Sequence, residues 1–544
     1  MSGIPSLSFT HFLAYSELTR ILQSLAAARP KLARLESLGK SREGRELWCL
    51  TVTDFATGKP EDKPAYVIHG NIHASELSGT HAALFTARQL LADYPAKTRL
   101  LANMTFHIVP RINPDGAELV VTGRGAVRSR MDRSNLPPNC LVSKDINGDG
   151  QALSMRILRE DGDMTPDPKE PRLMIRRKAE SKGPFYKVFP EGEILNWDGT
   201  DNIVVEGRSI DWNRQWSCEW KPEPEQGGSG DFPYSEPEMR CFAEFIAGRP
   251  NIFGVLGYHT GPAAFLRPPS TGTDNDLDEK DLRRMEEFGA VAAKFTGLPV
   301  VPVYRYCGKK QRNISLYGHF PGTGYQHWGL FVFEFEMGTM MDSAGMGFED
   351  YASRETEEDH QAARRRLMRW WDRRGRRPKL FLPWRKFRHP QLGEVEIGGI
   401  APAIGSGMTM ADLKKRCGGT YKFTLHHAGQ HPLVRLEDLQ AKPLGAGLWR
   451  VRVRVANRGG FPTHVTRRGA KLRRLQPVRV EFHVGRGMEL LSLSGHLEIG
   501  HLDGPAGQKP LEWFLRAPQG GRCKIAAIGG TGGNSVAEVQ LKRE

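Results

Sequence analysis

Apolar and polar positions along the first 340 residues alternate between strand-like and helix-like segments. Short apolar runs predict buried strands at 66–69, 104–110, 252–258 and 330–337. Apolar positions at helical spacing predict helices at 77–91, 236–246 and 279–295. This order is typical of an α/β fold with a mixed, largely parallel central sheet that is flanked by helices.

Two parts of the chain depart from this pattern. Residues from about 125 to 207 are polar and rich in Pro, Gly and charge, which indicates a long insertion in the α/β region. From about residue 426, short β-patterned runs such as LWRVRVRVAN alternate with turn residues and predict an all-β sandwich. We therefore expect an α/β domain at 1–375, a basic connector at 376–425 and an accessory β-sandwich domain at 426–544.

Composition narrows the class of protein. Of the 544 residues 39% are hydrophobic, which is enough to bury a sizeable core and excludes a largely disordered chain. No uncharged apolar run approaches about 18 residues, so we expect no membrane span. The first residues show no secretory signal, and the seven cysteines form no CxxC pair. We expect a cytoplasmic protein, or a secreted or periplasmic one if a leader has been removed.

The formal net charge of +15 is unevenly distributed. Twelve Lys and Arg residues lie at 364–388 and ten at 450–479, whereas these two stretches contain only one acidic residue. A nucleic-acid site would have to lie there. However, the alternation of Arg with Val near residue 450 is typical of a strand with one solvated basic face. We expect no nucleic-acid partner, and the sequence does not predict the oligomeric state.

The segment GNIHASE, in the turn after the first of these strands, is the most informative chemically. His73 and Glu76 are three residues apart at a predicted helix start, so both can face the crevice at the carboxyl end of the sheet. Two histidines and one carboxylate are a common zinc-ligand set in hydrolases. His259, at the end of a later strand, is the best third ligand. His69 competes for that role but suits the core better, and His81, within the helix, is interpreted as structural.

Five segments in chain order resemble the zinc metallocarboxypeptidases of the carboxypeptidase A type, the M14 family: GNIHASE, INPDG, SIDWNRQW, GYH and GLFVFEFEMG. The resemblance implies a zinc carboxypeptidase-like fold. It also implies hydrolysis of the C-terminal peptide bond of peptides or proteins by zinc-activated water, with a glutamate as general base. One Zn²⁺ per chain would be bound by His73, Glu76 and His259, and Asp211 would orient His73.

The same resemblance implies roles in substrate binding and proton transfer. Asn213 and Arg214 would bind the free α-carboxylate of the substrate, which suits a planar guanidinium. Glu336, on the last predicted strand, aligns with the general base and acid of the family. Glu334 lies two residues earlier on the same strand face. It would line the specificity pocket and favour a basic C-terminal side chain, and a paired structural carboxylate is the alternative.

Two further roles are implied less directly. Arg128 would stabilise the oxyanion, with Arg130 as a close competitor. Tyr317 would close over the substrate, although its loop departs in length from the family pattern. Two other functions stay open: an amidohydrolase, deacylase or cell-wall peptide hydrolase of the same fold, and a catalytically silent binding protein. The Asn213 and Arg214 pair argues against the first, and the complete set of expected ligands with Glu336 argues against the second.

A separate motif, DINGDG, resembles the start of a calcium loop. Asp145, Asn147 and Asp149 have the spacing of the first ligands, but Arg156 occupies the position of the bidentate glutamate of an EF-hand. Ca²⁺ is therefore a second candidate cofactor, and an Asx-rich turn is the alternative.

Overall fold

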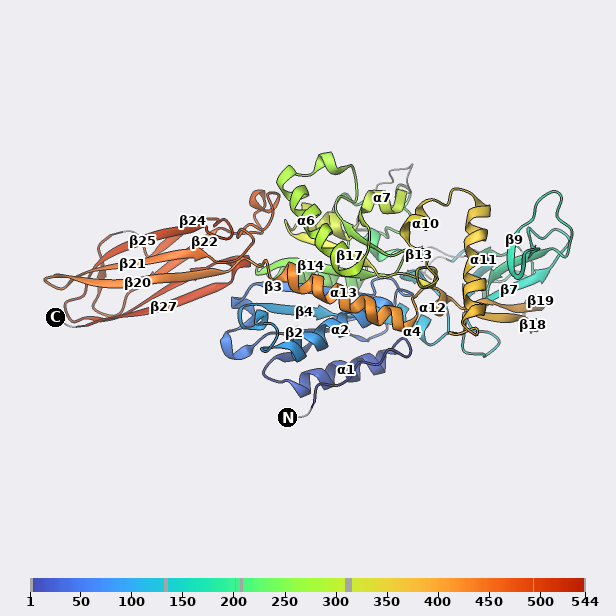
Figure 1. The fold of residues 1–544 in the computed structure, drawn as a ribbon, viewed down its shortest axis with the longest axis horizontal. Coiled ribbons are helices and arrows are strands. Elements are labelled where there is room, and N and C mark those ends of the chain that lie inside the picture. Colours follow the sequence, from blue (N-terminus) through green and yellow to red (C-terminus); the bar gives the residue numbers. More distant parts are fainter. Residues whose placement is uncertain are drawn as a thin grey trace.

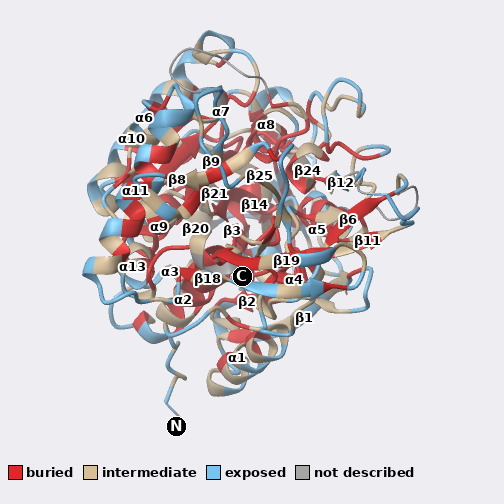
Figure 2. Cartoon of the chain, turned by 90° about the vertical axis from the view of Figure 1, so that its right-hand side faces the viewer, coloured by how far each residue is buried: buried red, intermediate tan, exposed pale blue. Residues whose placement is uncertain are grey.

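The computed structural model describes residues 3–131, 136–200, 202–205, 209–308, 316–492 and 494–542. Figure 1 shows an elongated molecule, with an α/β region in the middle, a smaller β-rich region at one end and a β-sandwich that carries the C-terminus at the other. Figure 2, viewed along the long axis, shows buried residues gathered around strands β3 (Ala65–Gly70) and β14 (Ile252–His259), whereas surrounding helices expose one face.

An eight-stranded mixed sheet forms the core of the α/β region, in the order β1-β2-β4-β3-β14-β17-β15-β16. Its other strands are β1 (Ala33–Lys40), β2 (Glu46–Val52), β4 (Thr105–Val109), β15 (Ala264–Arg267), β16 (Val300–Pro302) and β17 (Phe331–Glu336). The four central strands run parallel, and every residue in them is buried, as expected for strands covered on both faces. The predicted α/β fold class and its four predicted strands are confirmed.

Helices cover both faces of this sheet. On one face lie α2 (Ser78–Asp93), α6 (Glu279–Thr296) and α13 (Met410–Ala428), and on the other lie α5 (Pro237–Ala247) and α8 (Phe320–Gln326). The bounds of α6 have local causes: Asp278 accepts a hydrogen bond from the Lys280 N–H, and Gly297 ends the helix in the left-handed region at φ 70°. The three predicted helices are confirmed to within a few residues.

The remaining helices connect or border these elements. They are α1 (Tyr15–Ala28), α3 (Leu100–Asn103), α4 (Pro114–Val121), α7 (Val303–Gly308), α9 (Met340–Ser343), α10 (Phe348–Ala352), α11 (Glu357–Arg373) and α12 (Pro402–Gly405). The N-cap of α4 is Asn113, whose side chain accepts a hydrogen bond from the Gly116 N–H, so the NPDG motif is a helix start.

The predicted insertion forms most of a six-stranded sheet, in the order β18-β19-β7-β10-β8-β9. The strands from the insertion are β7 (Ser154–Leu158), β8 (Met164–Asp167), β9 (Glu170–Arg176) and β10 (Tyr186–Pro190). A hairpin of β18 (Phe381–His389) and β19 (Gly393–Ile400) completes the sheet, because β19 pairs antiparallel with β7. Two small sheets lie nearby: β6 (Cys140–Ser143) with β11 (Gly192–Leu195) and β12 (Val204–Val205), and β5 (Arg130–Met131) with β13 (Ser209–Ile210).

The segment 376–425, expected to be a connector, is packed into the parts on either side of it. Its hairpin belongs to the six-stranded sheet, and its last residues form most of α13, where Phe423 contacts Phe333 and Phe335 of β17. The sequence of α13 contains two glycines and several lysines, which interrupt the apolar pattern of a helix. For this reason the segment was interpreted as a basic connector and not as a buried core helix. This segment is therefore integrated structure, while the domain boundaries themselves stay a prediction.

Two four-stranded sheets form the predicted C-terminal sandwich. One contains β20 (Val434–Gly445), β21 (Leu448–Asn457), β23 (Glu489–Leu490) and β25 (Gln508–Arg516), and the other contains β22 (Val478–His483), β24 (His496–Gly500), β26 (Gly521–Ile528) and β27 (Asn534–Leu541). Alternate residues of β21 are buried, and Phe482 of one sheet stacks on Trp513 of the other at 4.8 Å between ring centroids. The sandwich prediction is confirmed.

The sandwich contacts the end of the central sheet where the parallel strands begin. Asn534 donates to Asp62, which precedes β3, with a distance of 2.8 Å. Thr466 donates to the carbonyl oxygen of Gly329, which precedes β17, at 2.8 Å. Since active sites of such sheets lie at the carboxyl ends of the strands, the sandwich is attached at the opposite end.

Candidate active site

The candidate site lies where three neighbouring parallel strands end. His259 is the last residue of β14 and Glu336 the last residue of β17, and these two residues are opposite each other in the strand register. β3 ends at Gly70, and the loop that follows carries His73 and Glu76 before α2 begins. The sequence pattern had placed His73, Glu76 and His259 at strand exits and the family resemblance had added Glu336, and the fold brings these residues to the same edge of the sheet.

The loop after β3 is held by its own backbone contacts. Gly70 lies so close to α2 that a Cβ at this position would come within 2.8 Å of the Gly79 backbone, so no larger residue fits there. Asn71 follows with φ 57° and donates its amide to the carbonyl oxygen of His73 at 2.5 Å. The N–H of Ala74 donates to the carbonyl oxygen of Arg128 at 2.7 Å. These bonds fix the direction in which His73 points.

His73, Glu76 and His259 offer three buried ligand atoms that lie within 4.8 Å of one another. The Nδ1 atoms of the two histidines are 2.8 and 2.9 Å from the two oxygens of Glu76. Two imidazoles and one carboxylate, with the remaining directions open, are a donor set that suits Zn²⁺. The expected ligand set is thus assembled by the fold, with both histidines presenting the same ring nitrogen.

A second carboxylate contacts the outer nitrogen of each histidine. His73 Nε2 is 3.0 Å from Asp211 Oδ1, and His259 Nε2 is 3.1 Å from Glu334 Oε1. Such partners fix the tautomer and the ring orientation of a metal-binding imidazole. The expectation for Asp211 agrees with this geometry. Glu334 is only 1% exposed and is paired with His259, so its position matches the alternative of a paired carboxylate rather than a specificity pocket wall.

The electrostatics of this group favour a bound cation. Burial raises the pKa of Glu76, but His73 and His259 outweigh burial, and the pKa lies well below its usual value. Burial lowers the pKa of His259, but Glu334 and Glu76 outweigh it, and the pKa lies well above its usual value. The buried carboxylates thus create a negative environment in which positive charge is stabilised.

Glu336 is the carboxylate of the site that has a free oxygen. Its Oε2 is buried and has no hydrogen-bond partner among the described residues. Burial, followed by the negative charge of Glu76, raises the pKa of Glu336 to about 8. A carboxylate with a raised pKa beside a set of metal ligands has the position and the basicity of a general base and acid.

The sequence analysis missed Tyr306, which is on α7. A Cβ built on Gly261 would lie 2.5 Å from the Tyr306 hydroxyl and 2.9 Å from Glu336 Oε2, so the hydroxyl and the carboxylate face the same small space. The Tyr306 hydroxyl donates to the carbonyl oxygen of Pro262 at 2.9 Å. Tyr317, the expected tyrosine, instead lies beside Lys221, whose Nζ is 5.6 Å from its ring centroid. The sequence RYCG around Tyr306 contains no motif that would distinguish this tyrosine from the others in the chain.

Arg128 lies in the site, whereas Arg130 does not. Pairing of β5 with β13 brings Arg128 beside Asp211, with 2.9 Å between Nε and Oδ2, and its Nη1 is 3.2 Å from Glu76. Burial lowers the pKa of Arg128, but Asp211 and Glu76 outweigh burial and raise the pKa. Arg130 forms a bidentate pair with Glu236, with distances of 2.6 and 2.8 Å. The geometry therefore favours Arg128 over Arg130 as the arginine next to the expected metal ligands.

Asn213 and Arg214 follow Asp211 in a short 3-10 turn, Trp212–Arg214. Asn213 is buried, and its amide contacts residues 319 and 320. Arg214 donates to the carbonyl oxygen of Asn213 at 2.7 Å and lies 3.8 Å from Asp211. The turn therefore places the amide and the guanidinium next to the carboxylate that supports His73.

His69 and His81 are both core residues. His69 packs against Phe242 and Phe320, and burial lowers the pKa of His69 well below its usual value. His81, within α2, packs against Phe9 and Phe12, and burial lowers its pKa to about 4. Neither ring nitrogen of either residue has a hydrogen-bond partner among the described residues.

The described residues contain a second group of potential ligands, Glu36, Cys49 and His107. The Thr51 hydroxyl lies between two of them, 3.1 Å from Glu36 and 3.0 Å from His107. Burial, followed by the positive charge of Arg249, lowers the pKa of His107 to about 3. Positive charge is therefore disfavoured here, in contrast to the group that contains Glu76.

The predicted calcium loop is a set of Asx turns, and calcium is not supported. The two carboxylate oxygens of Asp145 accept hydrogen bonds from the N–H groups of Gly148 and Gly150 at 2.8 and 2.9 Å. Asn147 accepts from the Asp149 N–H at 2.8 Å. These oxygens are occupied by the loop's own backbone.

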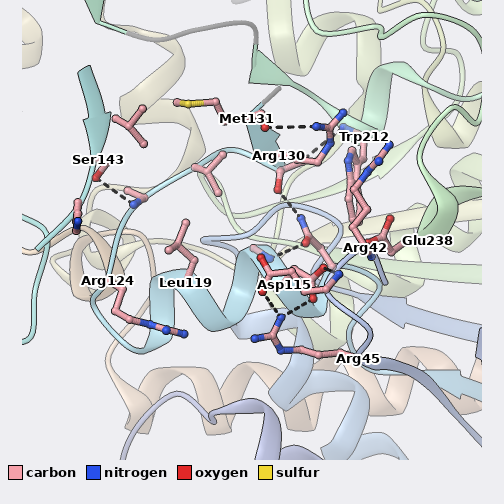
Figure 3. A pocket seen from close by; sticks show the side chains of 18 of the residues that line it. Arg42, Arg45, Asp115, Leu119, Arg124, Arg130, Met131, Ser143, Trp212 and Glu238 are labelled. Atoms are coloured by element: carbon pink, nitrogen blue, oxygen red, sulfur yellow. Dashed lines mark hydrogen bonds and ion pairs between the residues drawn. The ribbon is translucent and has the colours of Figure 1, made fainter. Parts of the chain in front are cut away.

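A cavity of about 880 Å³ lies next to the site, between the α/β region and the insertion. Figure 3 shows Arg45 paired with Asp115 at one side and Arg130 at another, with Leu119 and Ser143 on the remaining walls. The ligand group of His73, Glu76 and His259 does not line it. Among its charged side chains Arg45 pairs with Asp115 and Lys144 with Glu193, while Arg42 and Arg130 both pair with Glu236.

Comparison with known proteins agrees with this site. The mixed sheet with two histidines and one glutamate near its strand exits defines an α/β protein with a potential metal-binding site. The zinc carboxypeptidase family profile (Peptidase_M14) matches residues 18–298, slightly more than half of the chain, and the chain belongs to this family. The match contains the three expected ligands but ends before Glu336, whose assignment therefore rests on the resemblance of its strand and on its position in the structure. A second match, residues 433–540, is to a domain of unknown function (DUF8731).

Individual relatives match only part of the chain. Human carboxypeptidase Z is 30% identical over 148 residues, which cover 25% of this chain and 22% of that protein. Carboxypeptidase B of Astacus astacus is 33% identical over 110 residues, which cover 20% of this chain and 35% of that protein. The chain thus spans about a fifth of the length of the first curated relatives. Among solved structures, thrombin-activatable fibrinolysis inhibitor is 15% identical, covers 79% of each chain and has a TM-score of 0.44.

No helix among the described residues is long and apolar enough to cross a membrane.

Proposed function

We propose that this protein is a zinc-dependent carboxypeptidase that releases C-terminal residues from peptides or proteins. The observation that supports it best is the convergence of His73, Glu76 and His259 at strand exits, with Glu336 directly opposite His259 in the register. Membership of the zinc carboxypeptidase family supports the same reaction.

The residues fit a zinc ion. His73 and His259 present Nδ1 toward Glu76, and carboxylates hold both outer nitrogens, which is the arrangement that metal-bound imidazoles require. A zinc ion bound there would supply Lewis-acid activation of a water molecule and of the scissile carbonyl.

Glu336 would handle the proton. Its unpartnered Oε2 accepts the proton of the attacking water and later returns it to the leaving amine, which is general base and then general acid catalysis by one group. Arg128, held by Asp211 and Glu76, would place a fixed positive charge near the carbonyl oxygen as negative charge develops on it.

Asn213 and Arg214 would select the end of the chain. The free α-carboxylate of a substrate is a planar anion that a guanidinium and an amide N–H can bind together. The short turn that holds both side chains follows directly after Asp211, so the residues that would bind the α-carboxylate are adjacent in sequence to the carboxylate that contacts His73. An enzyme that cleaved internal amide bonds would have less use for this pair.

The test measures zinc content and the release of single C-terminal residues from a mixed peptide library. We expect one zinc per chain. We expect release from peptides with a free C-terminus and none from the same library with amidated C-termini, because the amidated peptides lack the α-carboxylate. Glu336→Gln is the matched control: it should keep zinc and lose roughly 10²–10⁴ in kcat. Zinc-loaded protein that releases nothing, or that cleaves both libraries equally, would contradict the proposal and favour a binding protein or an amidase.

A further inference from the structure

The orientation of Asn213 is set by two consecutive residues at the start of α8. Asn213 Oδ1 accepts a hydrogen bond from the Phe320 N–H at 2.9 Å, and Asn213 Nδ2 is 2.9 Å from His319 Nε2. A backbone N–H can only donate, so the first contact identifies the oxygen of the amide. The nitrogen must then face His319, and the amide cannot be turned over without losing both bonds.

This arrangement determines the tautomer of His319. Since Asn213 Nδ2 donates, His319 Nε2 must accept, and its proton must be on Nδ1. Nδ1 is 3.2 Å from the Ser270 hydroxyl, which can accept that proton in a hydrogen bond. The three side chains form a chain of hydrogen bonds from Ser270 through the imidazole to the amide.

The surroundings keep this imidazole neutral. Asn213, Ser270 and His319 are all buried. Burial, followed by the positive charges of Arg214 and His259, lowers the pKa of His319 well below its usual value, although Asp211 opposes the shift. A positive imidazole would carry a proton on Nε2 that points at the Asn213 amide, and this would break the contact.

Asn213 has one amide N–H that His319 does not use. The two hydrogens of Nδ2 are coplanar and fixed in direction once the oxygen is held by Phe320. One is directed to His319, so the direction of the other is determined as well. Arg214, the adjacent residue, supplies the charge that an anionic group would need.

We infer that His319 is a positioning residue, which turns the second amide N–H of Asn213 toward the terminal carboxylate of the substrate. The inference rests on the proposed carboxypeptidase function. His319 itself touches neither the metal ligands nor Glu336 through a hydrogen bond in the described residues. Its effect on the reaction is therefore expected in substrate binding rather than in the chemical step.

The test compares two variants of His319. His319→Leu removes the acceptor, whereas His319→Gln keeps an amide oxygen close to the position of Nε2. We expect H319L to raise KM roughly tenfold, the value of a lost hydrogen bond to a charged group. We expect kcat to stay within about twofold, because ground-state and transition-state binding of the carboxylate are lost together. H319Q should restore KM to near the wild-type value.

Two inhibitors distinguish a loss of Asn213 positioning from a general distortion of the site. A substituted succinate offers one carboxylate to the zinc and a second to Asn213 and Arg214, whereas acetohydroxamate binds only the zinc. H319L should weaken the succinate roughly tenfold and leave acetohydroxamate unchanged. Ser270→Ala is the control, since it removes the outer hydrogen bond and keeps the Nε2 acceptor, and it should have the smaller effect.

The outcomes distinguish this inference from the proposed function. If wild-type protein binds zinc but releases no C-terminal residue, the proposed function is wrong, and succinate binding still decides the role of His319. If H319L binds the succinate like the wild type, or weakens both inhibitors equally, the inference is wrong. Should H319L fail to fold, His319→Asn, whose shorter amide does not reach Asn213, takes its place in the same comparison.

Discussion

The two ends of strands β3, β14 and β17 place buried histidines in opposite electrostatic environments. At the carboxyl ends, His73 and His259 lie between carboxylates, and the pKa of His259 is raised well above its usual value. At the opposite end, His427 of α13 packs against Phe288 and Phe333, and burial lowers its pKa to about 3. Burial alone therefore makes a histidine neutral in this protein.

The difference between the two ends comes from their partners. The only described hydrogen bond of the His427 ring is between Nδ1 and the Tyr66 hydroxyl, at 2.7 Å, and Nε2 has no partner among the described residues. At the site, three carboxylates surround two histidines. The comparison shows that neighbouring carboxylates, not the degree of burial, decide whether the pKa of a buried histidine is raised or lowered.

The largest expected effect follows removal of a ligand. His259→Leu should abolish zinc binding and lower kcat/KM roughly a thousandfold or more, because activation of water is lost. Zinc content by atomic spectroscopy and peptide turnover measure this. His427→Leu, the same substitution at the other end of the strands, should keep both zinc and turnover. Equal zinc loss in the two variants would contradict the inference that only the histidines at the carboxyl ends of the strands bind zinc.

A smaller effect is expected from the carboxylates behind the ligands. Glu334→Gln keeps the size of the side chain but removes its charge, and should weaken zinc binding about 10- to 100-fold. Asp211→Asn is the matched change behind His73 and should have an effect in the same range. Competition with a chelator gives both zinc Kd values. Unchanged zinc affinity in E334Q would show that this carboxylate is only a packing partner.

The smallest effect concerns stability at the opposite end. His427→Leu leaves the Tyr66 hydroxyl buried without a partner, which should cost about 1–3 kcal/mol in the free energy of unfolding. Denaturant titration at pH 8 measures this cost.

The same variant tests the pKa of His427. Its folded pKa of about 3 lies below the usual value of 6.5, so the native state binds fewer protons than the unfolded state between these values. The stability of the wild type should therefore be fully present above about pH 6.5 and fall toward pH 3, by up to ~1.4 kcal/mol per pH unit from this group. H427L should lose less over that interval. Identical pH profiles would show that folding does not lower the pKa of His427.

Much of the α/β region and of the site was predictable from the sequence. Buried parallel strands are continuous apolar runs, and polar residues at their ends are conspicuous, which located His73 and His259, whereas Glu336 was assigned from the family resemblance. The sandwich was predictable from the alternation of residues along β21. These signals are local, and each lies within a single element.

The features that the sequence left undecided depend on contacts between distant segments. For Glu334 a pocket wall and a paired carboxylate were both open, and the contact with His259 of β14 favours the paired carboxylate. Arg128 and Arg130 could not be separated, because only the pairing of β5 with β13 shows which one reaches Asp211. His319 contacts Asn213 across 106 positions in the sequence, and no spacing rule connects them.

The hairpin of β18 and β19 and helix α13 affect how the chain folds during synthesis. The expected metal ligands and Glu336 have all been made once residue 336 is complete, but β17 lacks its covering helix until residue 428. In the insertion, β7 pairs with β10 and β19, and the pairing with β19 can form only after residues 393–400 have been made. Because a nascent chain emerges N-terminal end first, we expect the zinc-binding centre to become rigid only late in translation. A ribosome-bound chain that ends at residue 375 would have every ligand and still lack a complete core.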